Sequence, residues 1–359
     1  MCCGRLPAGQ GLPEHLRDTG YDTTGKSAAG AYSFGQALGE EALRAGFDAV
    51  VASGNHCLPG LLRAVRGRIP VLIDVHGSIR EPREYGGFTQ KFLRYPASLV
   101  FTWLVQRRVD GALVVTSDLA AEVLSMSPKL ETFVVPCACP YKPAWSDVMD
   151  DRQRWRGRLG IADQDFVLVH SGGLGLYQHP HAMIGALDQL LKNRISAKLL
   201  LATRKIEMAR EYMAQQPELV QRRTLVQKFP AGLHRHILAV GDAGLVLREP
   251  NATNKVAFPN KVDEYWAVGL PTITTPALRA VANLIEGNPV LGIVARGPKG
   301  QLTTDGLEAI TEIQNGGAEG RESRFHAIRA ARLQISFEVT LQPFLAYLIR
   351  AREARNGNV

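Results

Sequence analysis

Short apolar runs alternate along the chain with longer amphipathic stretches. In the first part, apolar runs typical of buried strands lie at 48–53, 70–77, 111–117 and 132–136. The stretches between them place apolar residues three and four positions apart, which predicts helices. Because strands that alternate with helices form parallel sheets covered on both faces, this pattern predicts an α/β domain.

The same alternation restarts in the second half, and the last part of the chain, from Arg321 to Arg355, is predicted to be helical. Between the two halves, the polar stretch 140–160 contains two prolines and is predicted to be an interdomain linker. We therefore predict two doubly wound α/β domains in tandem, with their carboxyl edges facing across a cleft. The strands predicted for the second domain are 165–171, 197–203, 223–229, 243–249, 271–275 and 292–296.

Length and composition agree with this organisation. A chain of 359 residues is long enough for two cores. Its 45% hydrophobic and 21% charged residues are ordinary for a soluble protein. No apolar run reaches the length of a membrane-spanning helix, and residues 1–11 lack the apolar core of a signal peptide. We therefore expect a cytoplasmic protein.

The net charge of +8 predicts an anionic partner, such as a nucleic acid, an acidic membrane surface or a phosphorylated substrate. Since no aromatic-plus-basic nucleic-acid module is visible, nucleic acid is the least favoured of the three. The five cysteines are odd in number, and the Cys137–Cys139 pair has no further ligands nearby. We interpret all five as reduced thiols and expect no bound metal.

Two predicted strands end in residues suited to a ligand site. Gly172 and Gly173 lie between a strand and a helix, where glycine lets the backbone approach a ligand closely. The alternative is a plain tight turn. His76 directly follows the strand at 70–75, where it could orient or polarise a substrate. The alternative for His76 is a histidine satisfied within a turn.

The stretch 254–276 predicts a short helix that begins after Pro259 and ends before Gly269. Lys261 and Glu264 are three residues apart and share one face of this helix. One interpretation is a local ion pair. The other is a binding element, in which Lys261 and the helix N-terminus hold a phosphate and Glu264 accepts from sugar hydroxyls. The residues predicted to pack inward are Val262, Tyr265 and Trp266.

Four segments together resemble the GT-B glycosyltransferases of the glycosyltransferase 4 type: "GALVVTSDLAAEVL" at 111–124, "FVLVHSGGLGLYQ" at 166–178, "GDAGLVL" at 241–247 and "FPNKVDEYWAVGLPTITT" at 258–275. The last of these is the most specific. The resemblance implies two Rossmann-like domains, with an acceptor-binding domain at 1–145, a nucleotide-sugar-binding domain at 146–325 and C-terminal helices at 326–359 that return to the first domain.

The resemblance also implies an activity. The reaction would be the retaining, metal-independent transfer of a sugar from a nucleotide-sugar to a glycan or lipid-linked acceptor, in bacterial polysaccharide or glycolipid synthesis. Two other functions remain open, a nucleotide-sugar epimerase of the same fold and a non-catalytic sugar-nucleotide-binding protein. The segment 90–108 mixes aromatic and basic residues. We favour a buried helix there over a peripheral contact with an anionic membrane.

The resemblance also implies a role for each residue that matches the family's pattern. Glu264 would hold the donor ribose, and His76 would act near the transferred sugar. Val256 occupies the position of a first glutamate found in many relatives, and the usual Arg and Lys after the glycine loop are absent. Lys261, or Arg204 with Lys205, would supply that charge. The remaining donor-binding candidates are Gly172 and Gly173 at the phosphate, Gln227 and Lys228 at the base, and Pro259, Asn260 and Lys261 at the diphosphate.

Overall fold

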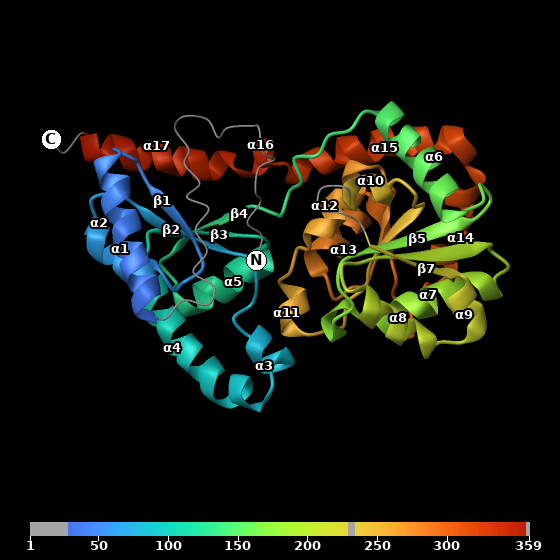
Figure 1. The fold of residues 1–359 in the computed structure, drawn as a ribbon. Coiled ribbons are helices and arrows are strands. Elements are labelled where there is room, and N and C mark those ends of the chain that lie inside the picture. The colour runs from blue at the N-terminus through green and yellow to red at the C-terminus, as the bar shows by residue number, and fades with distance from the viewer. Residues whose placement is uncertain (1–27, 229–233, 357–359) are drawn as a thin grey trace. The chain divides into compact units, whose positions relative to one another are not determined.

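The computed structural model describes residues 28–228 and 234–356 (Figure 1). The chain divides into two compact units, of which unit 1 comprises Met1–Val135 with Thr340–Val359 and unit 2 comprises Pro136–Val339. Residues 136–145, which we assigned to the first domain, thus group with unit 2. The predicted C-terminal segment 326–359 is shared between the two units. The cleft between the domains stays a prediction.

Unit 1 contains a four-stranded parallel sheet with the order β1-β2-β3-β4. The first three strands lie within predicted runs, and the fourth begins one residue earlier than predicted. The strands are β1 (Val50–Ser53), β2 (Val71–Val75), β3 (Gly111–Val114) and β4 (Glu131–Val134). The helical segments of this part of the chain are α1 (Ala28–Arg44), α2 (Leu58–Val65), α3 (Glu81–Tyr85), η1 (Gln90–Arg94), α4 (Tyr95–Gln106), α5 (Ser117–Met126) and α17 (Gln342–Asn356), with α16 (Phe337–Thr340) at the unit boundary.

The C-terminal helix α17 covers one face of this sheet. Leu72, Leu113 and Phe133 point to the same face and form a buried cluster with Phe344 of α17. The rings of Phe133 and Phe344 meet edge to face at 5.5 Å, a favourable aromatic geometry. This contact confirms the prediction that the C-terminal helix returns to the first domain.

Unit 2 contains a six-stranded parallel sheet with the order β10-β9-β8-β5-β6-β7. The order reverses between β5 and β8, which is the arrangement of a doubly wound Rossmann sheet. The strands are β5 (Phe166–Ser171), β6 (Ala197–Ala202), β7 (Thr224–Gln227), β8 (Ala243–Val246), β9 (Thr272–Thr274) and β10 (Gly292–Val294).

The helices of unit 2 are α6 (Trp145–Leu159), α7 (Pro180–Lys192), α8 (Ile206–Ala214), α9 (Glu218–Arg222), α10 (His234–Leu238), α11 (Ala252–Lys255), α12 (Asn260–Ala267), α13 (Arg279–Gly287), α14 (Thr304–Asn315) and α15 (Gly317–Arg332). Short 3₁₀ segments lie at η2 (Leu176–Gln178), η3 (Pro289–Leu291), η4 (Pro298–Gly300) and η5 (Leu333–Ile335).

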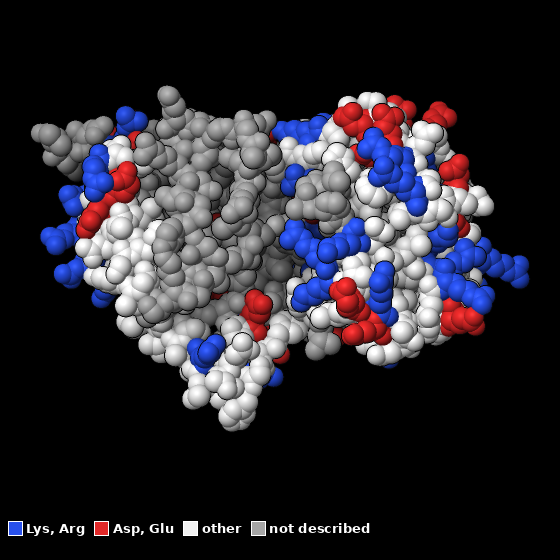
Figure 2. Space-filling model, in the orientation of Figure 1, with Lys and Arg blue, Asp and Glu red and all other residues white. Residues whose placement is uncertain are grey.

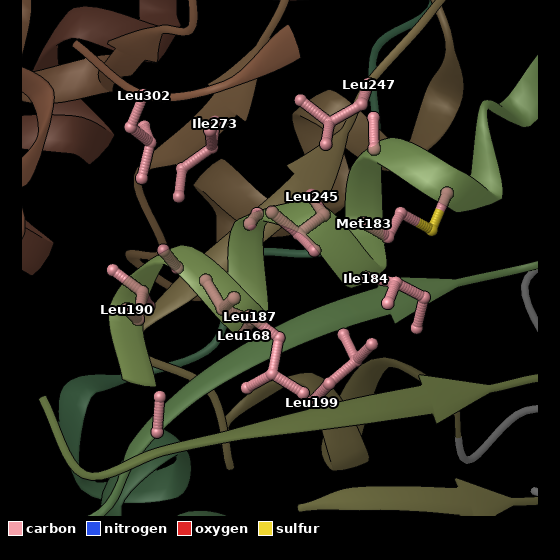
Figure 3. Close-up of a cluster of buried hydrophobic side chains, with 14 of the residues drawn as sticks. Leu168, Met183, Ile184, Leu187, Leu190, Leu199, Leu245, Leu247, Ile273 and Leu302 are labelled. Carbon is pink, nitrogen blue, oxygen red and sulfur yellow. The ribbon is translucent and has the colours of Figure 1, made fainter. Parts of the chain in front are cut away.

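The core of unit 2 lies between its sheet and α7. Leu168, Leu199 and Leu245 of three neighbouring strands pack with Met183 and Leu187 of α7 (Figure 3). Each fully buried side chain of this size stabilises the fold by about 1.5–3 kcal/mol relative to an exposed one. This core fixes the carboxyl ends of β5 and β8, where the candidate site lies.

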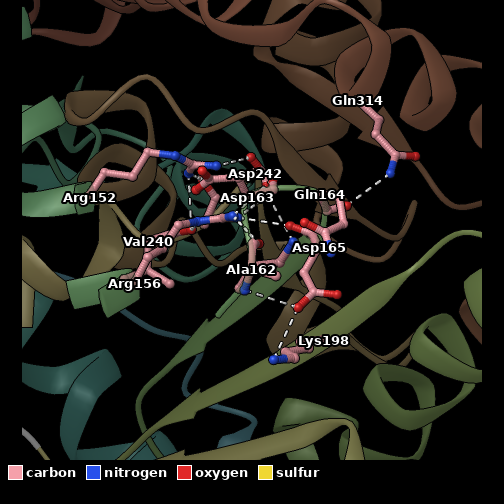
Figure 4. A network of polar contacts seen from close by, with 12 residues as sticks. Arg152, Arg156, Ala162, Asp163, Gln164, Asp165, Lys198, Val240, Asp242 and Gln314 are labelled. Atoms are coloured by element: carbon pink, nitrogen blue, oxygen red, sulfur yellow. Dashed lines mark hydrogen bonds and ion pairs between the residues drawn. The ribbon is translucent and has the colours of Figure 1, made fainter. Parts of the chain in front are cut away.

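The polar stretch 140–160 is not a linker for most of its length, so that interpretation was wrong. Residues 145–159 form α6, whose Arg152 and Arg156 are buried against Asp242 at 2.7 and 2.9 Å (Figure 4). Arg152 also donates to the carbonyl oxygens of Ala239 and Val240. The charges that suggested a solvated linker are instead satisfied inside unit 2, because ion pairs and backbone carbonyls compensate buried arginines.

The favoured interpretation of 90–108 as a buried helix was also wrong. In α4, the residues that are buried are Thr102, Val105 and Gln106, and Thr102 accepts a hydrogen bond of 3.1 Å from Asn55. Five large apolar side chains of the segment are exposed instead: Phe92, Leu93, Val100, Trp103 and Leu104. In the described part of the chain, no helix has both the length and the apolar character needed to cross a membrane.

Candidate functional site

The candidate site of unit 2 lies at the switch point of its sheet. The glycine loop follows β5, and Arg248 follows β8, which is paired with β5 in parallel. In parallel α/β sheets, ligands bind outside the carboxyl ends of strands where the strand order reverses. Helix α12, which carries Lys261 and Glu264, packs against β8.

Gly172 makes room for the side chain of Lys261. Its φ angle of +123° favours glycine. A Cβ atom at this position would lie 3.2 Å from Lys261 Nζ, so a larger residue would push the ammonium group away. The Gly172 N–H donates to the carbonyl of Ala202 at 2.8 Å. The backbone of the loop is thus fixed beside the lysine.

Lys261 is a half-buried cation of the site. Its Nζ donates to Oε1 of Gln178 at 2.9 Å. Burial holds the pKa of Lys261 well below its usual range, the nearby Arg248 lowers it further, and Glu264 opposes the shift. Burial thus disfavours the ammonium form of Lys261, and an anion bound beside Nζ would stabilise that form.

Arg248 is a second cation at this point and was not among the residues predicted from the sequence. Its side chain is 5% exposed. Its guanidinium donates to the side-chain oxygen of Gln178, which also accepts from Lys261. The same guanidinium lies 5.1 Å from the ring centroid of Tyr177. Thr275 donates to the Arg248 carbonyl at 2.8 Å. The available signal was a charged residue directly after a buried strand at the switch point.

Glu264 lies one turn beyond Lys261 on α12 and faces α10. Its Oε1 atom is 3.8 Å from Nε of Arg235, with side-chain exposures of 16% and 30% for the two residues. Lys261 thus turns toward the glycine loop and Glu264 toward Arg235. The helix itself begins at Asn260 and ends at Ala267, and its inward residues Tyr265 and Trp266 are fully buried, as predicted.

Two buried side chains hold the glycine loop. His170 Nε2 lies 2.9 Å from the carbonyl oxygen of Gly173, and the hydroxyl of Tyr265 accepts from the N–H of Ser171 at 2.9 Å. Burial lowers the pKa of His170, and the positive charge of Lys261 lowers it further. Neutral His170 can donate from Nε2 to the Gly173 carbonyl, and this hydrogen bond fixes the glycine loop to the end of β5.

The other predicted donor-binding residues lie along the same edge or at the start of α12. Arg204 and Lys205 follow β6 and are exposed, whereas Gln227 ends β7 and donates to the carbonyl of Lys228 at 2.9 Å. Residues 229–233, including the end of a predicted strand, lie outside the described residues. At α12, Pro259 is the N-cap and Asn260 is exposed. Val256 is buried, so the position where the resemblance implied a first glutamate is apolar here.

The predicted catalytic residue, His76, lies in unit 1 at the carboxyl end of β2. Its Nε2 is 2.7 Å from Oδ2 of Asp74, and both side chains are about 30% exposed. The next residues of the loop are fixed by Glu122 of α5, which accepts from the Ser78 hydroxyl at 2.8 Å and from the Ile79 N–H at 3.0 Å. His76 is therefore an oriented, accessible imidazole.

Three cysteines lie within the described ranges, and Cys57, Cys137 and Cys139 are free thiols there. Cys2 and Cys3 lie outside those ranges. Among the described residues, no group of three or more His, Cys, Asp or Glu side chains could hold a metal ion.

Known structures share this fold. No family model matches the sequence, and no curated protein matches it. HepE from Anabaena in complex with UDP superposes with a TM-score of 0.66 at 17% identity, covering 89% of this chain and 82% of that chain. A second HepE structure, with UDP and glucose, gives 0.63 at 18% identity, over 89% and 81%. Sucrose-phosphate synthase from Thermosynechococcus elongatus gives 0.65 at 14% identity, over 91% and 79%. The chain therefore has the two-domain fold of these proteins.

Proposed function

We propose that this protein is a glycosyltransferase that moves a sugar from a nucleotide-sugar donor to a glycan or lipid-linked acceptor. The observation that carries the proposal is the convergence of Lys261 and Arg248 on Gln178, beside the Gly172 backbone at the switch point. Two cations next to a glycine loop form a binding site for a diphosphate. The fold shared with HepE, whose structure contains UDP, supports the same proposal.

The donor diphosphate would occupy the space beside the glycine loop. Arg248 is a permanent cation, and an anion bound beside Lys261 favours the charged form of that side chain. As the sugar leaves, negative charge develops on the diphosphate, and fixed cations stabilise that charge without reorganising. The N-terminus of α12 adds a partial positive charge at Asn260. This arrangement supports a transfer that requires no metal.

Glu264 would bind the ribose of the donor. A carboxylate accepts from both hydroxyls of a vicinal diol, and Arg235 lies 3.8 Å from this one. Gln227 and Lys228, at the end of β7, would lie at the base. The donor would thus extend along the carboxyl edge of the sheet, from the base at β7 to the diphosphate at Gly172 and Gly173.

His76 would act near the transferred sugar, with Asp74 fixing the orientation of its ring. We propose that the transfer retains the anomeric configuration by a front-face route. The proposed setting is polysaccharide or glycolipid synthesis at the cytoplasmic side of a membrane, with which the protein associates peripherally.

The test is an assay of donor hydrolysis and sugar transfer across nucleotide-sugars. The proposal predicts turnover with at least one donor, and it predicts that H76A lowers kcat while donor binding is unchanged. Release of an altered donor without an acceptor would replace the proposal with an epimerase. Donor binding without any turnover would make the protein a non-catalytic binder, and neither binding nor turnover would refute the site.

A further inference from the structure

Helix α4 and the preceding η1 expose an apolar surface on unit 1. Its members include Phe92, Leu93 and Val100, which are 63%, 67% and 59% exposed. Trp103 and Leu104 continue it at 39% and 48%. In Figure 2, the lobe that Figure 1 shows to contain α3 and the start of α4 is mostly uncharged, with both basic and acidic groups at its edge. Such a contiguous patch marks an interaction site rather than scattered surface residues.

The segment that carries this surface is basic, whereas α3, which contacts η1, contributes Glu81 and Glu84. Residues 85–109 contain four Lys and Arg residues and no Asp or Glu. The guanidinium of Arg107 lies 4.0 Å over the ring of Trp103, so a cation and an amphipathic aromatic ring sit together at the end of α4. Apolar residues bordered by cations are typical of surfaces that lie on an anionic membrane.

A groove of about 680 Å³ adjoins the α4 surface. It is lined by Leu104 of α4 and by Arg108, which follows that helix. The lining residues also include Arg63 and Arg66 of the α2 region but no acid. Its apolar walls include Phe101. A groove with three guanidinium groups and an apolar wall fits a ligand that is anionic at one end and apolar at the other.

We propose that η1 and α4 dock on a bilayer containing anionic phospholipid and that this groove takes a phosphate headgroup. The twelve residues of α4 extend for about 18 Å at 1.5 Å per residue, so the helix would lie in the interface rather than cross it. Its apolar side chains would enter the acyl boundary, and Arg63, Arg66 and Arg108 would lie at headgroup level. This inference rests on the proposed function, which it deepens by naming the surface that brings the enzyme to a lipid-linked acceptor.

The test is cosedimentation of the full chain with vesicles of phosphatidylcholine, with or without phosphatidylglycerol, at low and high salt. The wild type should bind the anionic vesicles, less at high salt. Each basic residue near an anionic surface contributes roughly fivefold, so R63Q/R66Q/R108Q should lower partitioning on the order of a hundredfold. The matched control R158Q/R194Q/R210Q removes three exposed arginines from unit 2 and should change partitioning much less. W103S/L104S should weaken binding at both salt concentrations.

Three results would overturn the proposal. The first is no preference of the wild type for anionic vesicles, and the second is equal loss in the groove variant and its control. The third is a dimer in light scattering that W103S/L104S converts to a monomer, because the surface would then join two copies of the chain. Inorganic phosphate at millimolar concentration should not release the protein, since the groove needs the lipid. UDP binding, measured in parallel, tests the proposed function separately and should be the same in all variants.

Discussion

Arg332 and Asp263 form a buried bidentate ion pair, in which the guanidinium donates to the two carboxylate oxygens at 2.6 and 2.9 Å. Arg332 also donates to the carbonyls of Cys139 and Tyr141, and the Cys139 N–H donates to Asp263. The side chains are 9% and 1% exposed. Asp263 lies on α12 between Lys261 and Glu264, so this pair fixes the proposed donor-binding helix to residues 139–141 and to the end of α15.

Replacing Asp263 with Ala should strongly destabilise unit 2, because Arg332 would be left buried without a counter-ion. The expected loss is about 3–5 kcal/mol in the free energy of unfolding measured with urea. D188A is the matched control, since Asp188 forms an exposed pair with Lys192 and should cost less than about 1 kcal/mol. The double variant D263L/R332M should recover part of the loss. Equal effects of D263A and D188A would show that the pair contributes little.

Replacing Lys261 with Met should weaken UDP binding. A hydrogen bond to a charged group contributes about 1.5–3 kcal/mol, which corresponds to roughly a 10- to 150-fold rise in Kd. Isothermal titration calorimetry measures this directly. K192M, on the exposed side chain of Lys192, should bind UDP like the wild type, and a K261M variant that did so as well would exclude Lys261 from the diphosphate site.

Binding of UDP should also be coupled to proton uptake. Burial lowers the pKa of Lys261 in the empty protein, and a diphosphate beside Nζ should raise it toward the usual value of about 10.4. At any pH between the two values the complex therefore holds more protons than its components. Calorimetry in buffers of different ionisation enthalpy should report uptake in the wild type and much less in K261M. Proton release on binding would contradict this account.

The role of Glu264 can be tested through the ribose hydroxyls. The wild type should bind UDP more tightly than 2′,3′-dideoxyuridine diphosphate, because the dideoxy compound leaves the carboxylate without its donors. E264Q should lose most of this preference, since an amide is a weaker acceptor than a carboxylate. E312Q changes an exposed glutamate of α14 and should retain it. An unchanged preference in E264Q would place the ribose elsewhere.

Stability should fall on acidification through His170. Its pKa is lowered in the folded protein, so below about pH 6.5 the unfolded chain binds a proton that the folded protein does not. The contribution of His170 to stability is therefore fully present above about pH 6.5 and is lost as the pH falls toward the folded pKa, by up to about 1.4 kcal/mol per pH unit. Urea unfolding from pH 7.5 to 5 should show a smaller slope in H170N than in the wild type. H326N, at an exposed histidine, should leave the slope unchanged.

The sequence predicted the fold well because most strands lie in short apolar runs. The predicted helix at 260–268 agrees with α12 to one residue, since Pro259 and Gly269 fix its ends. Gly269 has a φ angle of +73°, which a glycine adopts without strain. Local signals of this kind require no knowledge of distant residues.

The segments and residues that were predicted wrongly or missed owe their positions to contacts with residues far along the chain. In α4, hydropathy suggested that the apolar residues are buried, but Thr102 and Gln106 face inward while Trp103 and Leu104 face outward. Arg248 was not predicted because it approaches Lys261 only in the folded chain, where both side chains donate to Gln178. In α6, the burial of Arg152 and Arg156 depends on Asp242, which lies far along the chain. A single sequence does not record such pairings.

The central claim is that the switch point of unit 2 binds a nucleoside diphosphate, and a thermal-shift panel with UDP, GDP, dTDP and ADP and their sugars tests it most directly. A ligand at a hundred times its Kd stabilises the folded protein by about 2.7 kcal/mol. For a unit of this size, that corresponds to a rise in Tm on the order of 5–10 °C. The account predicts such a rise with one nucleotide class in the wild type, and a much smaller rise in K261M at the same ligand concentration. No shift with any nucleotide, or equal shifts in the wild type and K261M, would contradict it.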